Sequence, residues 1–328
     1  MQRRVFSGIQ PTGSLHLGNY LGAIQNYVAL QDGYEAIYCI VDQHALTIRP
    51  DPQELRANVF EAARTLLACG LEPKRCTVFV QSHVPAHTEL AWILSCVTSF
   101  GDLSRMTQFK DKSDQAESKG EFVSAGLFGY PVLQTADIVL YKAAVVPVGE
   151  DQVQHIELAR EVVRRFHTVY GELFVEPQAL LSPAKRILGL DGQFKMSKSR
   201  GNEIGLLEPA ESVKKKLAVA KTDEKRKRRQ DPGEPNDCNI YSLHQYVTDR
   251  AEVARIETEC RRAGIGCVEC KGILGASVER IAGPIRARAA ELDAQPEIVR
   301  SALKEGAVKA NEIAQKTLGE VRERVGLR

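Results

Sequence analysis

Short apolar runs alternate with amphipathic stretches through the first 150 residues, and this alternation restricts the fold more than any other feature. Residues 5–8, 36–41 and 76–80 have the pattern of buried strands. Apolar side chains recur at helical spacing over residues 17–30, and Asp51–Pro52 opens a second such stretch. This βαβ order predicts an α/β fold, a Rossmann-like doubly wound parallel sheet that binds ligands at the carboxyl ends of its strands.

The character of the chain changes near residue 200. Beyond that point apolar residues recur at helical spacing, and no strand pattern of comparable quality follows. We therefore expect an α/β domain over residues 1–199 and a helical domain over residues 200–328, for which the length of 328 residues suffices. Residues 221–237 are charged and rich in Pro, Gly and Asp, which predicts a mobile linker or loop.

Charge and apolar content narrow the class of protein. The net charge is only +2, so affinity for nucleic acid would have to come from a local patch such as Lys225–Arg229. That run fits either a solvated loop or a contact to nucleic-acid phosphates, whose strength would depend on salt. No stretch approaches the roughly 20 apolar residues of a membrane span, and no apolar run of signal-peptide length opens the chain. We expect a cytoplasmic protein without membrane contact.

A glycine- and proline-containing turn, Gly8–Asn19, lies between the first predicted strand and the first predicted helix. Backbone N–H groups and the helix dipole at such a turn suit a phosphate or a ribose hydroxyl. Gly18 allows a nucleotide base to approach closely, and His16 and Asn19 can donate hydrogen bonds to phosphate or sugar. Taken alone, the turn is also compatible with a plain strand–turn–helix that carries a surface histidine.

Two further segments offer cations. Lys195–Ser199 places two ammonium groups three residues apart in a glycine-flanked loop, and Lys112 supplies a third group. During in-line attack on an α-phosphate, such cations stabilise the charge that develops on the departing pyrophosphate. Each segment taken alone is also compatible with a solvated polar loop.

Pro11–Asn19 and Lys195–Ser199 together resemble the HIGH and KMSKS signatures of class I aminoacyl-tRNA synthetases. The residues between them narrow the resemblance to the tryptophanyl-tRNA synthetases, a branch that also has asparagine at the position of Asn19. Tyrosyl-tRNA synthetases are the nearest relatives of that branch. The resemblance implies a homodimer that activates L-tryptophan with ATP and Mg²⁺, transfers it to tRNA(Trp), and contacts the anticodon through its helical half.

The resemblance also implies roles for the matching residues. The catalytic positions are His16, Asn19, Lys112, Lys195 and Lys198. The ATP-binding positions are Gln10, Pro11, Thr12, Gly18, Asn19, Gly149, Glu150, Asp151, Ile187, Lys195, Met196, Ser197, Lys198 and Ser199. The tryptophan-binding positions are Phe6, Gly8, His44, Tyr130, Gln134, Asp137, Val146, Val148 and Gln152.

Within this set, residues 124–137 are the candidate for substrate specificity. Pro131 is compatible with a first helical turn. Leu133, Gln134 and Asp137 then fall on one face of that helix. A carboxylate in an apolar pocket can accept a hydrogen bond from an indole N–H, and the pocket then rejects analogues that lack this donor. The alternative for Asp137 is a carboxylate on the helix surface.

Two other segments at strand ends carry candidates for which an alternative stays open. After a short strand pattern, Gly149 allows close approach, and Glu150 or Asp151 can bind ribose hydroxyls. The same acidic residues can instead cap the following helix. His44 also follows a strand, and it is either a pocket wall or a core histidine with its own hydrogen-bond partners.

Four cysteines in the C-terminal half, Cys238, Cys260, Cys267 and Cys270, have the spacing C-x21-C-x6-C-x2-C. A cytoplasmic location argues against structural disulfides. Four-cysteine zinc sites usually consist of two close pairs, whereas only one close pair is present here. We therefore predict a structural [4Fe–4S] cluster, with zinc or free thiols as alternatives. Some bacterial synthetases that the chain resembles carry such a cluster on a similar spacing.

Two other functions compete with a synthetase. A small-molecule nucleotidyltransferase also has a histidine–glycine motif at a strand–helix turn, but it leaves the KMSKS-type loop unexplained. A non-catalytic iron–sulfur or RNA-binding paralogue would not need both lysines of that loop together with Asp137. Tryptophan-dependent ATP–pyrophosphate exchange separates the three functions.

Overall fold

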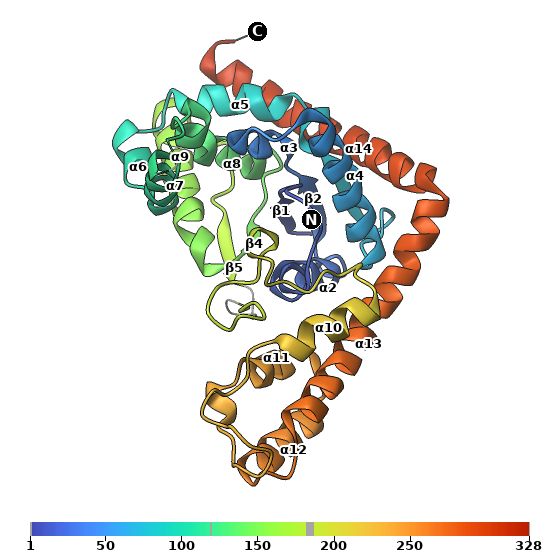
Figure 1. Cartoon of the computed structure of the whole chain (residues 1–328). Coiled ribbons are helices and arrows are strands. Elements are labelled where there is room, and N and C mark those ends of the chain that lie inside the picture. Colours follow the sequence, from blue (N-terminus) through green and yellow to red (C-terminus); the bar gives the residue numbers. More distant parts are fainter. Residues whose placement is uncertain (1, 119, 182–186, 328) are drawn as a thin grey trace.

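A parallel sheet of five strands lies at the centre of the larger of two lobes (Figure 1). The computed structural model describes residues 2–118, 120–181 and 187–327. The strands are β1 (Arg4–Ile9), β2 (Glu35–Ile40), β3 (Cys76–Val80), β4 (Val145–Val148) and β5 (Gln178–Leu181). They stand in the order β3-β2-β1-β4-β5, and every pairing is parallel. The strand order therefore reverses between β1 and β4, where a crevice for a ligand is expected.

Helices of the larger lobe precede, follow and connect the strands. Three consecutive pieces form one helical stretch over residues 17–30, as predicted: α1 (Leu17–Asn19), the π-helical turn η1 (Tyr20–Ile24) and α2 (Gln25–Leu30). The other elements of the N-terminal part are α3 (Asp42–Ala45), η2 (Leu46–Ile48), α4 (Pro52–Ala68), η3 (Gln81–His83), α5 (Ala86–Ser95), α6 (Phe100–Ser104), α7 (Thr107–Ser118), α8 (Ala125–Val139), η4 (Glu150–Gln152) and α9 (Val153–Tyr170).

The C-terminal part is helical in the described residues, as predicted. Its elements are η5 (Lys198–Arg200), α10 (Ala210–Val219), η6 (Pro235–Asp237), α11 (Asn239–Val247), α12 (Arg250–Arg261), α13 (Cys267–Ala294) and α14 (Pro296–Val325). Helices α10 to α12 and the start of α13 form the smaller lobe (Figure 1). No described helix is both long enough and apolar enough to cross a membrane.

Separate apolar cores cover the two faces of the sheet. On β2, Ile37 and Cys39 face one core, and Tyr38 and Ile40 face the other. Helices α5, α8 and α9 contribute to the first core, and α2 and α4 contribute to the second. Strands that are buried on both faces read as continuous apolar runs, which is why the alternation in the sequence identified them. The predicted Rossmann-like fold is confirmed.

Helix α4 shows how a local sequence signal sets a helix start. The Asp51 carboxylate accepts the N–H groups of Gln53 and Glu54 at 2.8 and 3.0 Å. Pro52 occupies the first helical position, where its missing N–H costs nothing because that group has no partner within a helix.

Helix α8 begins earlier than expected. Ser124 caps it by accepting the N–H of Leu127 at 3.1 Å, so the helix starts at Ala125. Pro131 therefore lies inside the helix, and its placement in a first turn is wrong. The Ser124 hydroxyl accepts a free N–H group of the first helical turn, whereas a proline side chain has no acceptor. The serine therefore sets the helix start.

The last two helices return to the sheet. Helices α13 and α14 run from the smaller lobe along one side of the larger lobe (Figure 1). Ala310, Ala314 and Leu318 of α14 are fully buried in a core of the sheet, and α14 packs along β3. The division at residue 199 stays a prediction, but the apolar cores of the larger lobe draw residues from both sides of it.

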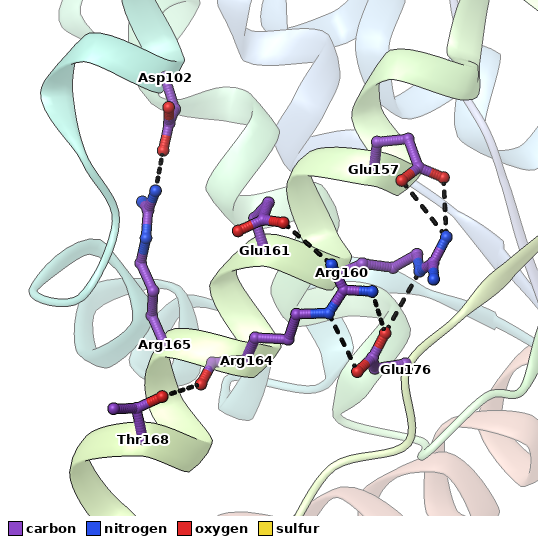
Figure 2. A network of polar contacts seen from close by, with 8 residues as sticks. All are labelled: Asp102, Glu157, Arg160, Glu161, Arg164, Arg165, Thr168 and Glu176. Carbon is purple, nitrogen blue, oxygen red and sulfur yellow. Dashed lines mark hydrogen bonds and ion pairs between the residues drawn. The ribbon is translucent and has the colours of Figure 1, made fainter.

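Ion pairs along α9 hold the segment that enters β5 (Figure 2). Glu176 accepts hydrogen bonds from Arg160 at 3.3 Å and from Arg164 at 2.8 Å. The same arginines pair with Glu157 and Glu161 on α9 itself. Exposed pairs contribute at most about 1 kcal/mol each, so this network positions the chain more than it stabilises the fold.

The charged segment 221–237 folds onto the smaller lobe. Asp223 is buried and accepts the N–H groups of Lys225 and Glu234, both at 2.8 Å. Arg226 donates to the carbonyl of Ile265 at 2.9 Å. Part of the basic run therefore has structural partners within the lobe.

Candidate active site

The carboxyl ends of β1 and β4 open into a cavity of about 390 Å³. This is the place where the strand order reverses, so the loops after the two strands part and leave room for a ligand. Many of the predicted binding residues line the cavity. They are Phe6, Gly8, Gln10, His44, Lys112, Tyr130, Gln134, Asp137, Val146, Val148, Gly149, Asp151 and Gln152.

Asp137 lines the cavity from α8 and is only 1% exposed. Its Oδ2 lies 2.7 Å from His44 Nε2, and its Oδ1 lies 2.8 Å from Gln81 Nε2 and 2.7 Å from His87 Nδ1. Burial by itself would raise the pKa of this carboxyl, but His44 and His87 outweigh burial and hold the pKa well below its usual range. Asp137 is therefore a charged, buried acceptor, and the surface-carboxylate alternative is wrong.

Tyr130 stands on the same helix, close to polar groups from other elements. Its hydroxyl lies 2.8 Å from His155 Nε2, and the Lys112 ammonium lies 5.0 Å from the centre of its ring. Burial lowers the pKa of Lys112. Nearby, Gln134 donates to Gln152 Oε1 at 3.4 Å. This wall of the cavity suits a ligand that combines an aromatic ring with charged ends.

His16 and Asn19 cap α1 reciprocally. His16 Nδ1 accepts the N–H of Asn19 at 3.3 Å, and Asn19 Oδ1 accepts the N–H of His16 at 3.0 Å. Burial lowers the pKa of His16 to about 4, while Glu203 opposes the effect and Lys195 adds to it. His16 is therefore neutral at pH 7. Because Nδ1 is an acceptor, the ring proton sits on Nε2, where it can be donated to a ligand.

The second signature loop packs against the first. A Cβ added at Gly13 would meet Lys198 Nζ at 3.0 Å, and one added at Gly18 would meet Met196 Cβ at 3.3 Å. Met196 is 2% exposed and anchors the loop in an apolar cluster that also contains Leu17 of α1. Two segments separated by about 180 residues therefore form one surface, as their joint resemblance to the synthetase signatures implies.

Asn202 fixes the shape of the second signature loop. Its Oδ1 accepts the N–H of Ser197 at 2.8 Å, and its Nδ2 donates to Asp191 at 2.7 Å and to the carbonyl of Lys195 at 3.4 Å. One buried amide thus holds the backbone of the loop at Lys195 and Ser197, and the side chains of Lys195 and Lys198 are exposed.

The remaining predicted residues lie outside the cavity lining. They are Pro11, Thr12, His16, Gly18, Asn19, Glu150, Ile187, Lys195, Met196, Ser197, Lys198 and Ser199. Glu150 and Asp151 do not cap α9, because its N-cap is Gln152 and no side chain makes the capping bond. His44 lines the cavity and also bonds Asp137, so both interpretations of this residue hold.

Several residues around the cavity were not predicted. Gln81 and His87 come from the region after β3, and the position of Gln81 directly after a strand is a signal that could have identified it. His87 and Tyr141 carry no such local signal. The unpredicted residues that line the cavity include Ser7, Tyr27, Val41, Gln108 and Ile138.

The four clustered cysteines border a second, small cavity in the smaller lobe. Cys238, Cys260, Cys267 and Cys270 line it together with apolar side chains. Burial, followed by the neighbouring thiols, raises the pKa of Cys270 to about 12. Within the described residues, no group of three or more histidine, cysteine or acidic side chains is arranged to hold a metal ion.

Comparison with known proteins agrees with this geometry. The family of class I tRNA synthetases for tryptophan and tyrosine (W and Y) matches residues 2–282. The chain is 52% identical over 329 residues to the tryptophan–tRNA ligase of Deinococcus radiodurans and covers 98% of each chain. It is 45% identical over 334 residues to the tryptophan–tRNA ligase of Caldanaerobacter subterraneus, covering 99% of this chain and 98% of the relative.

Among solved structures, the chain resembles the tryptophanyl-tRNA synthetase of Campylobacter jejuni in complex with ADP and tryptophan. The TM-score is 0.88 at 35% identity, covering 99% of this chain and 100% of the other. The chain therefore belongs to the class I tRNA synthetases for tryptophan and tyrosine. The curated relatives confirm the narrower prediction as well, that of a tryptophan–tRNA ligase.

Proposed function

We propose that this chain activates L-tryptophan with ATP and then transfers it to the 3′ end of tRNA(Trp). The observation that carries the proposal is a single cavity at the switch point of the sheet, which combines the buried Asp137 carboxylate with Gln10 from the first signature turn. A pocket for an indole ring thereby adjoins a turn suited to a nucleotide.

In the proposed pocket, different residues bind different parts of the two substrates. Asp137 accepts the indole N–H, while Tyr130, Gln134 and Gln152 bind the polar end of tryptophan. Gln10, Gly149 and Asp151 lie at the ends of β1 and β4, where they would hold the nucleoside.

In the proposed first step, a carboxylate oxygen of tryptophan attacks the α-phosphorus of ATP. The bond from that phosphorus to the bridging oxygen breaks, pyrophosphate leaves, and tryptophanyl-adenylate forms. Mg²⁺, when it accompanies ATP, would neutralise part of the phosphate charge. Lys112, Lys195 and Lys198 supply ammonium groups for the departing pyrophosphate, and neutral His16 donates from Nε2. In the second step a ribose hydroxyl of the tRNA terminus attacks the acyl carbon, and AMP leaves.

The double variant Lys195→Ala/Lys198→Ala tests the role of the loop. Tryptophan-dependent ATP–pyrophosphate exchange should fall by roughly 10²–10³ for each group, because the cations act on charge that develops in the transition state. Tryptophan binding, measured by calorimetry, should change little. Lys214→Ala on the exposed face of α10 is the matched control.

Exchange at the wild-type rate in the double variant would show that the loop is not catalytic. Exchange driven by tyrosine would favour a tyrosyl-tRNA synthetase, and exchange that needs neither amino acid would favour the nucleotidyltransferase.

We also propose that the four cysteines bind a [4Fe–4S] cluster with a structural role. They converge on one cavity from the junction of η6 and α11, from α12 and from α13, and hydrogen-bond donors stand beside two of the sulfurs. Arg226 lies 3.9 Å from Cys260 Sγ, and His244 Nε2 lies 3.4 Å from Cys270 Sγ. Donors of this kind stabilise the thiolates of an anionic cluster.

A cluster would tie the junction of η6 and α11 to α12 and α13, and it would so order the lobe that we propose contacts the anticodon. Protein purified without oxygen should be brown and contain about four irons per chain. Cys260→Ser should lose the iron and weaken tRNA charging more than ATP–pyrophosphate exchange. Cys69→Ser, a cysteine outside the lobe, is the control. Colourless protein with one zinc per chain would favour zinc instead.

We further propose a cytoplasmic homodimer. Large apolar side chains that are more than half exposed gather on elements around α8: Leu46, Ile48, Trp92, Phe100 and Phe122. Elements η2, α5 and α6 all contact α8, and the Phe100 ring lies 5.0 Å from that of Phe128 on α8. Exposed apolar side chains on neighbouring elements are typical of a protein interface, and a second copy of the chain is the proposed occupant.

A further inference from the structure

A buried chain of hydrogen bonds extends behind Asp137, on the side away from the cavity. His87 Nδ1 lies 2.7 Å from Asp137 Oδ1, and His87 Nε2 lies 2.8 Å from the Tyr141 hydroxyl. His87 and Tyr141 are both fully buried, and neither lines the cavity. Neither residue can contact a ligand in the cavity directly, whereas Asp137, the hydrogen-bond partner of His87, lines the cavity.

The direction of these hydrogen bonds is set by the charge of Asp137. An ionised carboxylate only accepts, so His87 must carry its proton on Nδ1. The second ring nitrogen, Nε2, lies 2.8 Å from the Tyr141 hydroxyl. Burial raises the pKa of the Tyr141 hydroxyl well above its usual range and keeps it protonated. Tyr141 therefore holds the imidazole ring in the orientation from which Nδ1 donates to Asp137.

The hydroxyl of Tyr141 is itself held in place by packing. Its ring stacks on Phe6, with centroids 5.5 Å apart, and meets Phe79 edge-on at 5.7 Å. Phe6 is also a wall of the cavity. The position of the Tyr141 hydroxyl is thus determined by close-packed rings, one of which is a wall of the cavity.

The three hydrogen-bond partners of the Asp137 carboxylate leave one position at which it can accept a further hydrogen bond. Oδ1 accepts from His87 and from Gln81, which uses both of its in-plane positions, whereas Oδ2 has His44 as its partner. A carboxylate offers about four such positions. One position on Oδ2 is left for a ligand, and an indole ring carries a single N–H donor. The one free acceptor position of Asp137 therefore matches the one N–H donor of the indole ring.

We infer that His87 and Tyr141, together with Gln81, orient the Asp137 carboxylate so that one Oδ2 position faces the indole N–H. They are positioning residues that set tryptophan specificity without touching the substrate. The inference rests on the proposed role of Asp137 as the indole acceptor. Packing alone would not require a hydroxyl at the buried position of Tyr141, since a phenylalanine would fill nearly the same space.

Tyr141→Phe tests the inference because it removes the hydroxyl and leaves the ring. Tryptophan-dependent ATP–pyrophosphate exchange should show a KM for tryptophan about threefold to tenfold higher, the effect of one buried hydrogen bond. The kcat and the KM for ATP should stay near the wild-type values. Preference for tryptophan over its benzothiophene analogue, which has sulfur in place of the N–H, should fall by the same factor as the KM rises.

Substitutions at His87 add a rescue measurement. His87→Asn keeps an N–H near the position of Nδ1, so it should retain more of the preference for tryptophan than His87→Leu does. The matched control is Tyr241→Phe, which removes the hydroxyl of a buried tyrosine that donates to Glu257 at 2.8 Å. Tyr241 lies on α11 in the smaller lobe and does not line the active-site cavity. This control should lower the thermal unfolding temperature about as much as Tyr141→Phe does, with no change in the KM for tryptophan.

Two different results would contradict the positioning role of His87 and Tyr141 and the role of Asp137 as indole acceptor. If the wild-type enzyme accepts the analogue as well as tryptophan, Asp137 does not read the N–H. If the wild-type enzyme discriminates but Tyr141→Phe keeps its KM and its preference, the chain behind Asp137 is merely structural and the inference is overturned. Should His87→Leu fail to fold, Tyr141→Phe still decides between these outcomes.

Discussion

Burial sets the charge of two histidines next to the active site. The pKa of His155 is lowered to about 4 by burial and by Lys112, against the opposing effect of Asp151. His16 has a pKa of about 4 for the same main reason. Both rings are therefore neutral at pH 7, and each can act as a hydrogen-bonding group without adding positive charge where ATP is proposed to bind.

The His155 environment predicts a pH dependence of stability. Its folded pKa of about 4 lies below the unfolded value of 6.5, so the unfolded chain binds more protons between these values. The free energy of unfolding should therefore fall as the pH falls from 6.5 to 4, by on the order of 3 kcal/mol from this group. Urea unfolding of wild type and His155→Gln across this range should show a shallower decline in the variant. The exposed His83→Gln variant should follow the wild type.

At the scale of elements, α14 covers a strand that would otherwise lie at the edge of the sheet. β3 ends the strand order on one side, and α14 packs along it. Gly306 allows this close approach, because a Cβ there would overlap the backbone carbonyl of Val78. Arg322 of α14 also forms two hydrogen bonds of 2.6 Å to Glu89 of α5. A covered edge cannot pair with another chain.

Two glycines of α14 allow a matched test of this packing. Gly306→Ala should lower the free energy of unfolding by about 1–3 kcal/mol, because the added methyl must push the helix off β3. Gly319→Ala adds the same methyl to the same helix where nothing lies within 4 Å, and it should raise stability by about 0.5–1 kcal/mol through helix propensity. Chemical denaturation of both variants measures the difference. Equal effects would show that α14 does not press on β3.

At the scale of the whole molecule, the exposed apolar side chains around α8 are the proposed interface of the homodimer. Trp92 and Phe100 are 73% and 74% exposed, and burial of such rings is a large source of association energy. The active-site helix α8 contacts α5 and α6, which carry these two side chains. Dimer formation would therefore stabilise the helix that carries Tyr130 and Asp137.

The double variant Trp92→Arg/Phe100→Arg should disrupt the proposed dimer. Light scattering coupled to gel filtration should give twice the chain mass for the wild type and the chain mass for the variant. Val219→Arg, a change at an isolated exposed residue of α10, should leave the mass at the wild-type value. A wild-type chain that is monomeric at micromolar concentration would contradict the dimer.

The sequence by itself determined strands β1 to β4, helix α4 and the turn that we propose binds the nucleotide, because each depends on neighbours along the chain. Burial on both faces gives a strand its continuous apolar run, and the cap of α4 involves only residues 51–54. Even the mutual capping of His16 and Asn19 spans four consecutive residues. Resemblance to a family then supplied the roles of individual side chains, including Asp137.

Only the tertiary structure decided what surrounds those side chains. Gln81 and His87 reach Asp137 across 56 and 50 residues of sequence, so no local pattern connects them. The sequence likewise assigned α14 to the helical half, whereas the structure packs it on β3. The physical reason is the same in each case. Whether a carboxylate is buried, paired and charged depends on which distant elements close around it, and that is a property of packing and not of spacing.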